Sequence, residues 1–400
     1  MAEQVKARIN PEMLVWARKT AGYSQEEAAR KISTSVERLQ KWECGEDYPT
    51  IKQLRKIGSV FKRPTAIFYK KHVPEEPVQL PDFRLVHDME QGSSYSPRLR
   101  LEIRKAMMRR EIALDLASQL GEDKSEFNLS IHLGNPTSHV ARQIREALNV
   151  SLEEQYSWRN HYEALRTWVS AMESIGILVF QFSDVEVEHA RGFSIGDRPY
   201  PVIAVNSKDT PRGRIFTLFH ELTHILMRRG GVCDLHDADE NMNHDVEAYC
   251  NRVAGESLVP TDALLAQELV AQRPVHMTWE DWELRQLANR FMVSQEVILR
   301  RLLTLGKTDV RFYNRKRNEF LEQYKRQEET KTEGKVPYYR RVLSENGRAY
   351  TYMVLNAWHN ELISTRDVSN FLGGINLEHV NRIEKELFGV LTGGGPDVLY

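Results

Sequence analysis

Residues 215–227 of this 400-residue chain read IFTLFHELTHILM, an almost wholly apolar run that contains two histidines and one glutamate. Thr210 and Pro211 precede the run as an expected N-cap and first helical residue, so we predict one helix through it. A helix that is apolar on nearly every side is buried, and buried histidine or glutamate side chains need partners. The run therefore predicts a central helix that carries functional side chains.

The two histidines of this run, His220 and His224, lie one helical turn apart and so project from the same face. Imidazoles placed in this way can bind one Zn²⁺ at about 2.0–2.1 Å each. Glu221 lies beside them and can accept a proton from a water molecule that the metal activates. This arrangement favours hydrolysis of a peptide bond. The alternative is a pair of core histidines that bond to backbone carbonyls.

A third metal ligand has to come from elsewhere, and residues 245–258 are expected to form a further helix. Residues that follow one another at intervals of three or four positions share one face of a helix. On the face expected to meet the core these residues form a stripe of Glu247, Cys250, Ala254 and Leu258. A carboxylate on that stripe is costly unless it binds a metal or a cation, so Glu247 is the predicted third ligand and Asp245 the alternative. His236 and His244 lie in the preceding loop and could bind a reaction oxyanion, but such histidines are more often solvated and are left out of the site.

Four segments, residues 192–194, 201–206, 216–224 and 247–260, resemble the ImmA/IrrE metallopeptidases. The resemblance implies that His220, His224 and Glu247 bind the metal and that Glu221 is the catalytic residue. The implied cofactor is Zn²⁺, and two histidines with a carboxylate also accept Mn²⁺. Members of this family typically cut helix-turn-helix repressors or antitoxins and so switch on stress, mobile-element or toxin genes. The expected substrate is therefore a protein of that kind.

Length, apolar runs and cysteines narrow the class of protein. Four hundred residues are enough for two to four domains. No apolar run approaches the 18 residues of a membrane span and the N-terminus lacks a signal-peptide segment, so we expect no membrane association. The cysteines, Cys44, Cys233 and Cys250, are scattered without metal-pair spacing, which favours a reducing cytoplasm.

Charge is uneven along the chain. Residues 1–73 hold 15 Lys and Arg against 8 Asp and Glu, a balance of +7, although the whole chain carries −1. The same segment has the pattern of a five-helix domain: Pro11 opens the first helix and residues 24–27 form a capping box before the second. A third helix is predicted over 35–42. The pattern from Ser24 through Gly45 to Thr50 resembles the XRE, or phage-repressor-like, helix-turn-helix family.

In that family the third helix enters the major groove, so its outward residues are the predicted DNA contacts. These residues are Thr34, Ser35, Val36, Glu37, Arg38, Gln40 and Lys41. Arg38 and Lys41 suit guanine edges or phosphate and Gln40 suits adenine. The Glu37 carboxylate departs from the pattern, because phosphates repel it unless it reads a cytosine amine. The +7 balance favours double-stranded DNA as a partner of residues 1–73. The alternative is a domain that keeps the fold and docks a similar domain of a substrate or partner.

The remaining segments complete the predicted plan, which is mainly α with a small β-sheet (α+β). Helices are expected over 96–120, 137–148 and 154–175, and strands over 176–182, 191–195 and 202–206. The predicted parts after the N-terminal domain are a Pro-rich linker (74–95), a zincin-like peptidase domain (96–275), a second helix-turn-helix-like segment (276–310) and a charged, exposed helix with a C-terminal helical region (311–400).

The predicted function is a zinc-dependent endopeptidase fused to a helix-turn-helix domain. The alternative is a DNA-binding regulator or toxin–antitoxin component in which the metallopeptidase fold is mainly a scaffold. Because a relic of an enzyme should have lost at least one functional residue, the intact set of Glu221 and three ligands favours catalysis.

Overall fold

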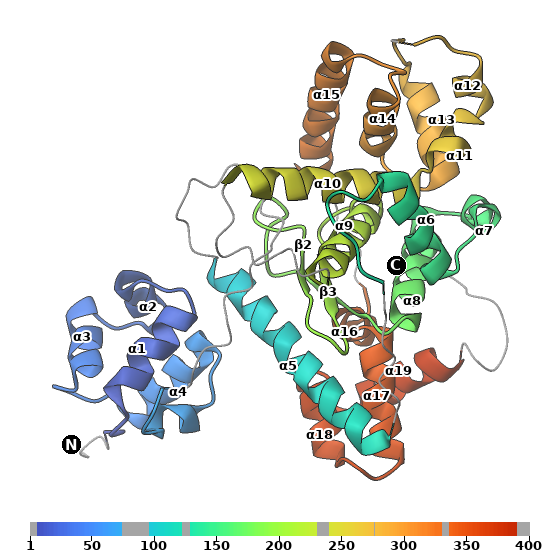
Figure 1. Ribbon diagram of the computed structural model, residues 1–400. Coiled ribbons are helices and arrows are strands. Elements are labelled where there is room, and N and C mark those ends of the chain that lie inside the picture. The colour runs from blue at the N-terminus through green and yellow to red at the C-terminus, as the bar shows by residue number, and fades with distance from the viewer. Residues whose placement is uncertain are drawn as a thin grey trace. The chain divides into compact units, whose positions relative to one another are not determined.

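The computed structural model describes residues 6–73, 96–121, 129–229, 240–275, 277–329 and 336–389 (Figure 1). These residues are mainly helical with one three-stranded sheet, which confirms the predicted α+β class. They fall into two compact units, one up to Lys105 and one from Ala106 onward. The Pro-rich linker predicted over 74–95 lies outside the described residues. Among the described helices, none combines the length and apolarity needed to cross a membrane.

The first unit contains the predicted five-helix bundle. Its elements are α1 (Pro11–Thr20), α2 (Gln25–Ile32), α3 (Val36–Cys44), α4 (Ile51–Phe61) and the 3₁₀ helix η1 (Thr65–Tyr69). Ser24 begins α2 with a reciprocal capping box, as predicted, and Gly45 ends α3 in the left-handed conformation with φ +77°. Leu39 and Trp42 of α3 are fully buried in the core of the bundle, which fixes the outward face of this helix.

The second unit is built on a small mixed sheet. Its strands are β1 (Leu178–Phe182), β2 (Gly192–Ile195) and β3 (Val202–Asn206), in the order β1-β3-β2. β3 runs parallel to β1 and antiparallel to β2. Nearly every residue of the three strands is buried, because helices cover the sheet.

Four helices form the layer that holds the candidate site. They are α6 (Thr137–Leu148), α8 (His161–Ser174), α9 (Pro211–Arg229) and α10 (Glu240–Leu258). α9 packs on β2 and β3, α8 packs on α9 and β1, and α10 packs across α9 and α6 (Figure 1). The single helix predicted over 154–175 is wrong. The chain forms α7 (Leu152–Ser157) and then α8, because Asn160 caps α8 by accepting hydrogen bonds from the N–H groups of Tyr162 and Glu163.

Helices after α10 extend the same core. They are α11 (Thr261–Leu265), α12 (Glu268–Ala271), α13 (Asp281–Phe291), α14 (Gln295–Thr304) and α15 (Val310–Glu329). α13 and α14 form the predicted second helix pair, and α14 packs on α10. The prediction of an exposed charged helix after them is wrong in part, since α15 buries Phe312, Tyr313 and Phe320 in the main core. These three aromatic side chains lie on one face of the helix. The many charged residues between them make this apolar face difficult to recognise in the sequence.

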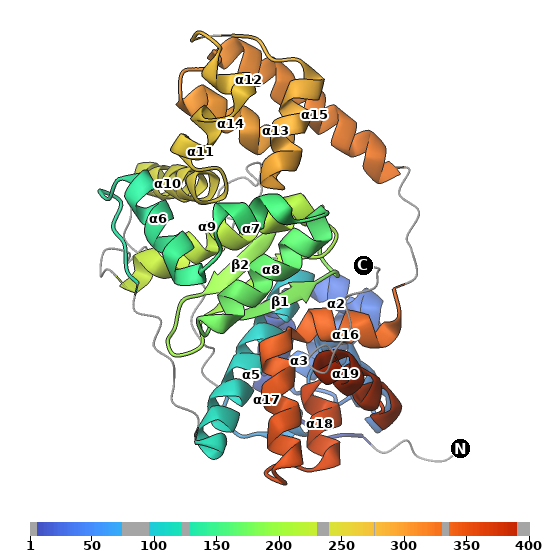
Figure 2. The same cartoon turned by 90° about the vertical axis from the view of Figure 1, so that its right-hand side faces the viewer.

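The C-terminal region is helical, as predicted, and covers the edge of the sheet at β1. It contains α16 (Tyr338–Asn346), α17 (Arg348–His359), α18 (Thr365–Phe371) and α19 (Leu377–Gly389). α16 and α17 lie against β1 (Figure 2), and α5 (Pro97–Leu120) contributes Arg109, whose guanidinium stacks over the ring of Phe180 at 5.2 Å. The α16–α17 junction is Gly347, with φ +73°, where an added Cβ would overlap the carbonyl oxygen of Val179.

A carboxylate from α8 caps α17 at this junction. Glu173 accepts a hydrogen bond from the backbone N–H of Ala349 at 3.1 Å, and burial raises its pKa from 4.5 to about 7 even though the N–H groups of Ala349 and Arg348 favour the charged form. A carboxyl whose folded-state pKa is raised favours folding below its unfolded pKa, and this advantage disappears as the pH rises through the folded-state pKa.

Glu173→Gln should therefore change the pH dependence of stability. Glutamine keeps an acceptor for Ala349 but cannot ionise. As the pH rises from 5 to 8, we therefore expect the free energy of unfolding of the variant to increase by about 2 kcal/mol relative to that of the parent. Urea unfolding at both pH values measures this difference. Glu146→Gln, an exposed change on α6, is the control. A parent–variant difference that stays constant with pH would contradict the assignment.

Candidate active site

Two helices, α9 and α10, bring together the three predicted metal ligands. His220 and His224 project from one face of α9, and Glu247 faces them from α10. Both imidazoles are buried, as the apolar surroundings of α9 predict. Glu247 lies at the rim, with 42% of its side chain exposed, whereas Cys250, Ala254 and Leu258 on the same stripe are fully buried. The carboxylate therefore ends the buried stripe at the side of the site that is open to solvent.

Donor-atom distances test whether a metal ion fits. His220 Nε2 lies 3.1 Å from His224 Nε2, Glu247 Oε2 lies 3.3 Å from His220 Nε2, and Glu247 Oε1 lies 3.1 Å from His224 Nε2. Ligands bound tetrahedrally at about 2.0–2.1 Å are separated by about 3.3 Å, so the observed spacings match a zinc-sized ion. One potential ligand atom from each of the three side chains lies within 4.8 Å of the other two.

Electrostatics at this cluster also suit a cation. Burial opposes the ionisation of Glu247, but hydrogen bonds from His220 and His224 outweigh it and hold the pKa of the carboxyl well below its usual range. Burial likewise opposes the protonated form of His224. Electrostatic attraction and hydrogen bonds from Cys250, Glu247 and Glu221 outweigh this effect and raise the pKa of the imidazole well above its ordinary value. The space among the three donors thus favours positive charge.

The fourth functional side chain, Glu221, is fully buried beside the cluster and is positioned by β2. Ser194 Oγ donates a hydrogen bond to Glu221 Oε2 at 2.9 Å. Gly192, two residues earlier on the same face of the strand, allows this approach, because an added Cβ would lie 2.5 Å from Thr217 Cγ2 and 2.9 Å from the carbonyl oxygen of Ala204. Ser194 carried no predicted role, because its contact with Glu221 arises only where β2 packs against α9.

Three other residues were considered from the sequence, and the structure describes the side chain of one of them, Asp245. Asp245 is exposed and lies outside the donor cluster. His236 and the side chain of His244 lie outside the described residues.

Metal content separates the two candidate third ligands. We expect the parent chain to bind one Zn²⁺ and Glu247→Ala to weaken that binding by about 100-fold or more, since the change removes one of three ligands. Asp245→Ala, two residues earlier on α10, should leave binding unchanged. Elemental emission analysis after dialysis against buffered zinc gives the measurement. Loss of metal from Asp245→Ala rather than from Glu247→Ala would reverse the assignment.

A second candidate site is the outward face of α3 in the first unit. Ser35, Glu37, Arg38, Gln40 and Lys41 are exposed and Thr34 is half-buried, so the structure leaves the predicted DNA-contacting face accessible within this unit. Val36 is also half-buried. Ser35 is the N-cap of α3 and accepts a hydrogen bond from the N–H of Arg38.

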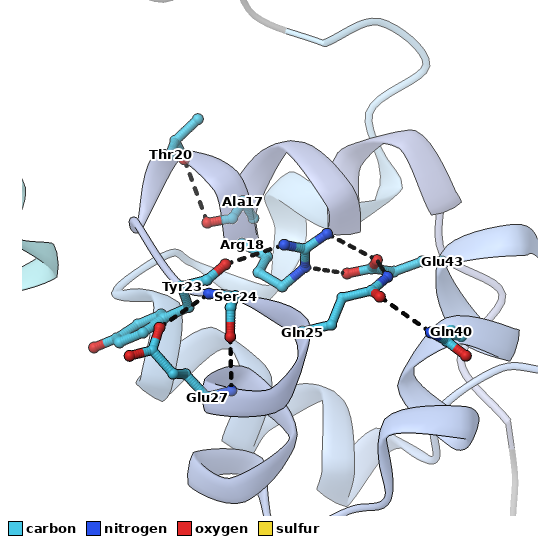
Figure 3. Close-up of polar contacts among 9 residues, drawn as sticks. All are labelled: Ala17, Arg18, Thr20, Tyr23, Ser24, Gln25, Glu27, Gln40 and Glu43. Atoms are coloured by element: carbon cyan, nitrogen blue, oxygen red, sulfur yellow. Dashed lines mark hydrogen bonds and ion pairs between the residues drawn. The ribbon is translucent and has the colours of Figure 1, made fainter. Parts of the chain in front are cut away.

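Polar contacts, most of them part-buried, link α3 to α1 and α2 (Figure 3). Arg18 binds both carboxylate oxygens of Glu43, at 2.6 and 3.0 Å, and also donates to the carbonyl oxygen of Tyr23. Gln25 donates to Glu43 at 2.8 Å and accepts from Gln40 Nε2 at 3.1 Å (Figure 3). The network positions Gln40 on the exposed face through a partner on α2, so the two glutamines present one paired surface.

Glu37 has a local partner that explains its place in the first turn of α3. Its carboxylate accepts hydrogen bonds from its own backbone N–H and from Ser35, and these bonds lower its pKa. A negative side chain at a helix N-terminus is stabilising, but it also stands where a phosphate would bind.

Duplex binding by the full chain tests this face. Changing Arg38 and Lys41 together to alanine should weaken binding to a mixed-sequence duplex about tenfold at low salt and reduce the salt dependence, because two phosphate or base contacts are lost. Arg382→Ala on α19, also an exposed arginine, is the control. Fluorescence anisotropy at several salt concentrations gives both quantities. If the parent does not bind the duplex, or if the double variant binds it as tightly as the parent does, the docking alternative is favoured.

Two family models match the chain. Residues 172–303 match the IrrE N-terminal-like domain of peptidase family M78, and residues 14–68 match a helix-turn-helix family. These matches confirm the resemblance drawn from the sequence motifs. A search of curated proteins finds no relative of this chain.

Proposed function

We propose that this chain is a metal-dependent endopeptidase that cleaves a helix-turn-helix repressor or antitoxin. In the sequence, its IrrE N-terminal-like peptidase domain follows a helix-turn-helix domain. The observation that carries the proposal is the convergence of three donor atoms from His220, His224 and Glu247 beside the buried carboxylate of Glu221. Cleavage would switch on stress, mobile-element or toxin genes.

The residues present fit one role each. His220, His224 and Glu247 would hold Zn²⁺, and the donor set also accepts Mn²⁺. When bound, the metal supplies a Lewis acid that lowers the pKa of water and balances negative charge on the scissile carbonyl oxygen. Glu221 accepts a proton from the attacking water and returns it to the leaving amine. Ser194 holds one oxygen of Glu221, so the carboxylate is oriented before the substrate arrives.

The sheet offers a way to bind an extended substrate. β2 is an edge strand, and it carries Ser194 next to Glu221. α16 and α17 pack against the opposite edge strand, β1. A substrate segment that adds as a further strand beside β2 would place its backbone next to the catalytic carboxylate.

The helix-turn-helix domain would bring enzyme and substrate together. It would either hold the enzyme on DNA near its target repressor or bind the similar domain of that repressor. The exposed Arg38 and Lys41 on α3 favour the first arrangement.

Co-expression with helix-turn-helix repressors encoded by neighbouring genes tests the proposal. We expect the parent to produce a cleaved repressor, seen by mass spectrometry, and Glu221→Gln to leave the repressor intact. If no repressor is cleaved while the chain still controls transcription, the regulator with a metallopeptidase scaffold is the better description.

A further inference from the structure

Positive charge in the first unit is concentrated after α3. Residues 48–73 hold seven Lys and Arg and no Asp or Glu, whereas residues 34–47, which include α3, hold two Lys and Arg against four Asp and Glu. The balance of +7 over residues 1–73 is therefore carried by the segment that contains α4 and η1. The helix predicted to read DNA is not its source.

The cations on the outward face of α3 are partly compensated. The Arg38 guanidinium stacks over the ring of Trp42 at 5.6 Å. It also attracts the Asp47 carboxylate, whose pKa is lowered first by a hydrogen bond from Lys6 and to a smaller degree by Arg38. Glu37 precedes Arg38 in the same helix. The outward face of α3 thus carries little net charge.

One face of α4 has the opposite character. Its buried side packs Leu54, Ile57 and Phe61 into the bundle, and its exposed side carries only cations as charged residues. We call these cations the α4 basic face: Lys52, Arg55, Lys56 and, at the C-cap, Lys62. Their spacings of three to seven residues place them on one side of the helix, over about 15 Å of its length.

The charges of this face are not neutralised within the described part of the chain, where none of the four cations pairs with a carboxylate. Lys56 Nζ donates to the hydroxyl of Ser33 at 2.7 Å, a neutral partner that leaves its charge uncompensated. α4 packs on α2 and η1, whereas α3 packs on α1 and α2, and α1 stands between α3 and α4 (Figure 1). The α4 basic face is therefore separate from the outward face of α3.

The composition of the face indicates the class of partner. Ile51 is the single large apolar side chain exposed on α4. Interfaces between proteins are depleted of lysine and have an apolar centre, whereas interfaces with DNA are polar and much more positively charged. The aromatic residue of α4, Phe61, is fully buried, so the face offers no ring on which an unpaired base stacks. These features favour a duplex over a protein or a single strand.

We propose that the α4 basic face binds the phosphate backbone of duplex DNA, as a second contact surface of the first unit in addition to α3. Phosphate contacts carry no sequence information, so this surface supplies affinity without regard to sequence. It also makes the affinity depend on salt, because each phosphate that is neutralised releases counterions. The inference concerns DNA contacts alone and does not depend on the proposed peptidase function.

Fluorescence anisotropy of the parent chain with a mixed-sequence duplex, measured at several salt concentrations, tests this face. The variant changes Lys52, Arg55 and Lys56 together to glutamine. Each lost phosphate contact lowers the slope of log K against log salt concentration by about 0.9, so we expect the slope to fall by about 2 to 3. Affinity at low salt should fall by about tenfold or more. A second duplex of unrelated sequence should show the same losses.

A matched control removes three charges from elsewhere on the chain. Changing Arg142, Arg285 and Lys385 together to glutamine alters exposed positions of the second unit and should keep the parent slope. Thermal unfolding checks that both triple variants are folded. The proposal is overturned if the parent does not bind a duplex or if the control lowers the slope as much as the α4 variant does. It is also overturned if the α4 variant keeps the parent slope, and an acidic protein is then the better partner for this face.

Discussion

Glu221→Gln is expected to reduce peptide-bond cleavage about a thousandfold while leaving the metal content unchanged. Glutamine has almost the same shape as glutamate and can still accept the hydrogen bond from Ser194 Oγ, so the packing of α9 against β2 should persist. The amide cannot accept the proton of the attacking water, and this loss affects the rate rather than binding. Initial cleavage rates for an identified repressor, measured at equal metal loading, give the comparison.

Ser194→Ala provides the graded control for this prediction. It removes the hydrogen bond that orients Glu221 but leaves the carboxylate itself, so we expect a loss of about 10- to 100-fold. The order of rates should be parent, then Ser194→Ala, then Glu221→Gln. Cleavage by Glu221→Gln at the parent rate would remove Glu221 from the mechanism, and the metal site would then need another explanation.

The central helix and its histidine pair could be predicted because they depend on local geometry. One turn of helix places His220 and His224 on the same face wherever the segment folds as a helix. Glu247 followed from the periodicity of its own helix, yet that argument assumed a buried carboxylate, and the side chain is partly exposed at the rim of the site. The pattern identified the face of the helix but not how deeply the Glu247 side chain is buried.

Contacts between distant segments could not be predicted in the same way. Ser194 meets Glu221 only because β2 packs against α9, and nothing in either segment alone specifies that contact. The cover over β1 is a stronger case, since α16 and α17 contact that strand although they follow it in the chain by a long distance. Contacts of this kind depend on the tertiary fold and not on the pattern of either segment.

The cover over β1 depends on Gly347, and Gly347→Ala should lower the free energy of unfolding by about 4 kcal/mol. Two causes add. Gly347 has φ +73° and ψ 159°, a conformation that is almost restricted to glycine, and its new Cβ would overlap the backbone oxygen of Val179, which cannot move without disturbing β1.

Gly373→Ala separates these two causes. Gly373 also has a positive φ, +95°, but an added Cβ there would meet nothing within 4 Å, so backbone strain alone should cost about 1 kcal/mol. Urea unfolding of the full chain, combined with limited proteolysis of the 336–389 region, measures both variants. A larger loss for Gly347→Ala together with earlier cleavage between α16 and α19 is expected, because the overlap pushes the α16–α17 junction off the sheet. Equal losses for the two glycines would mean that the close approach to Val179 contributes nothing to how the C-terminal helices are held.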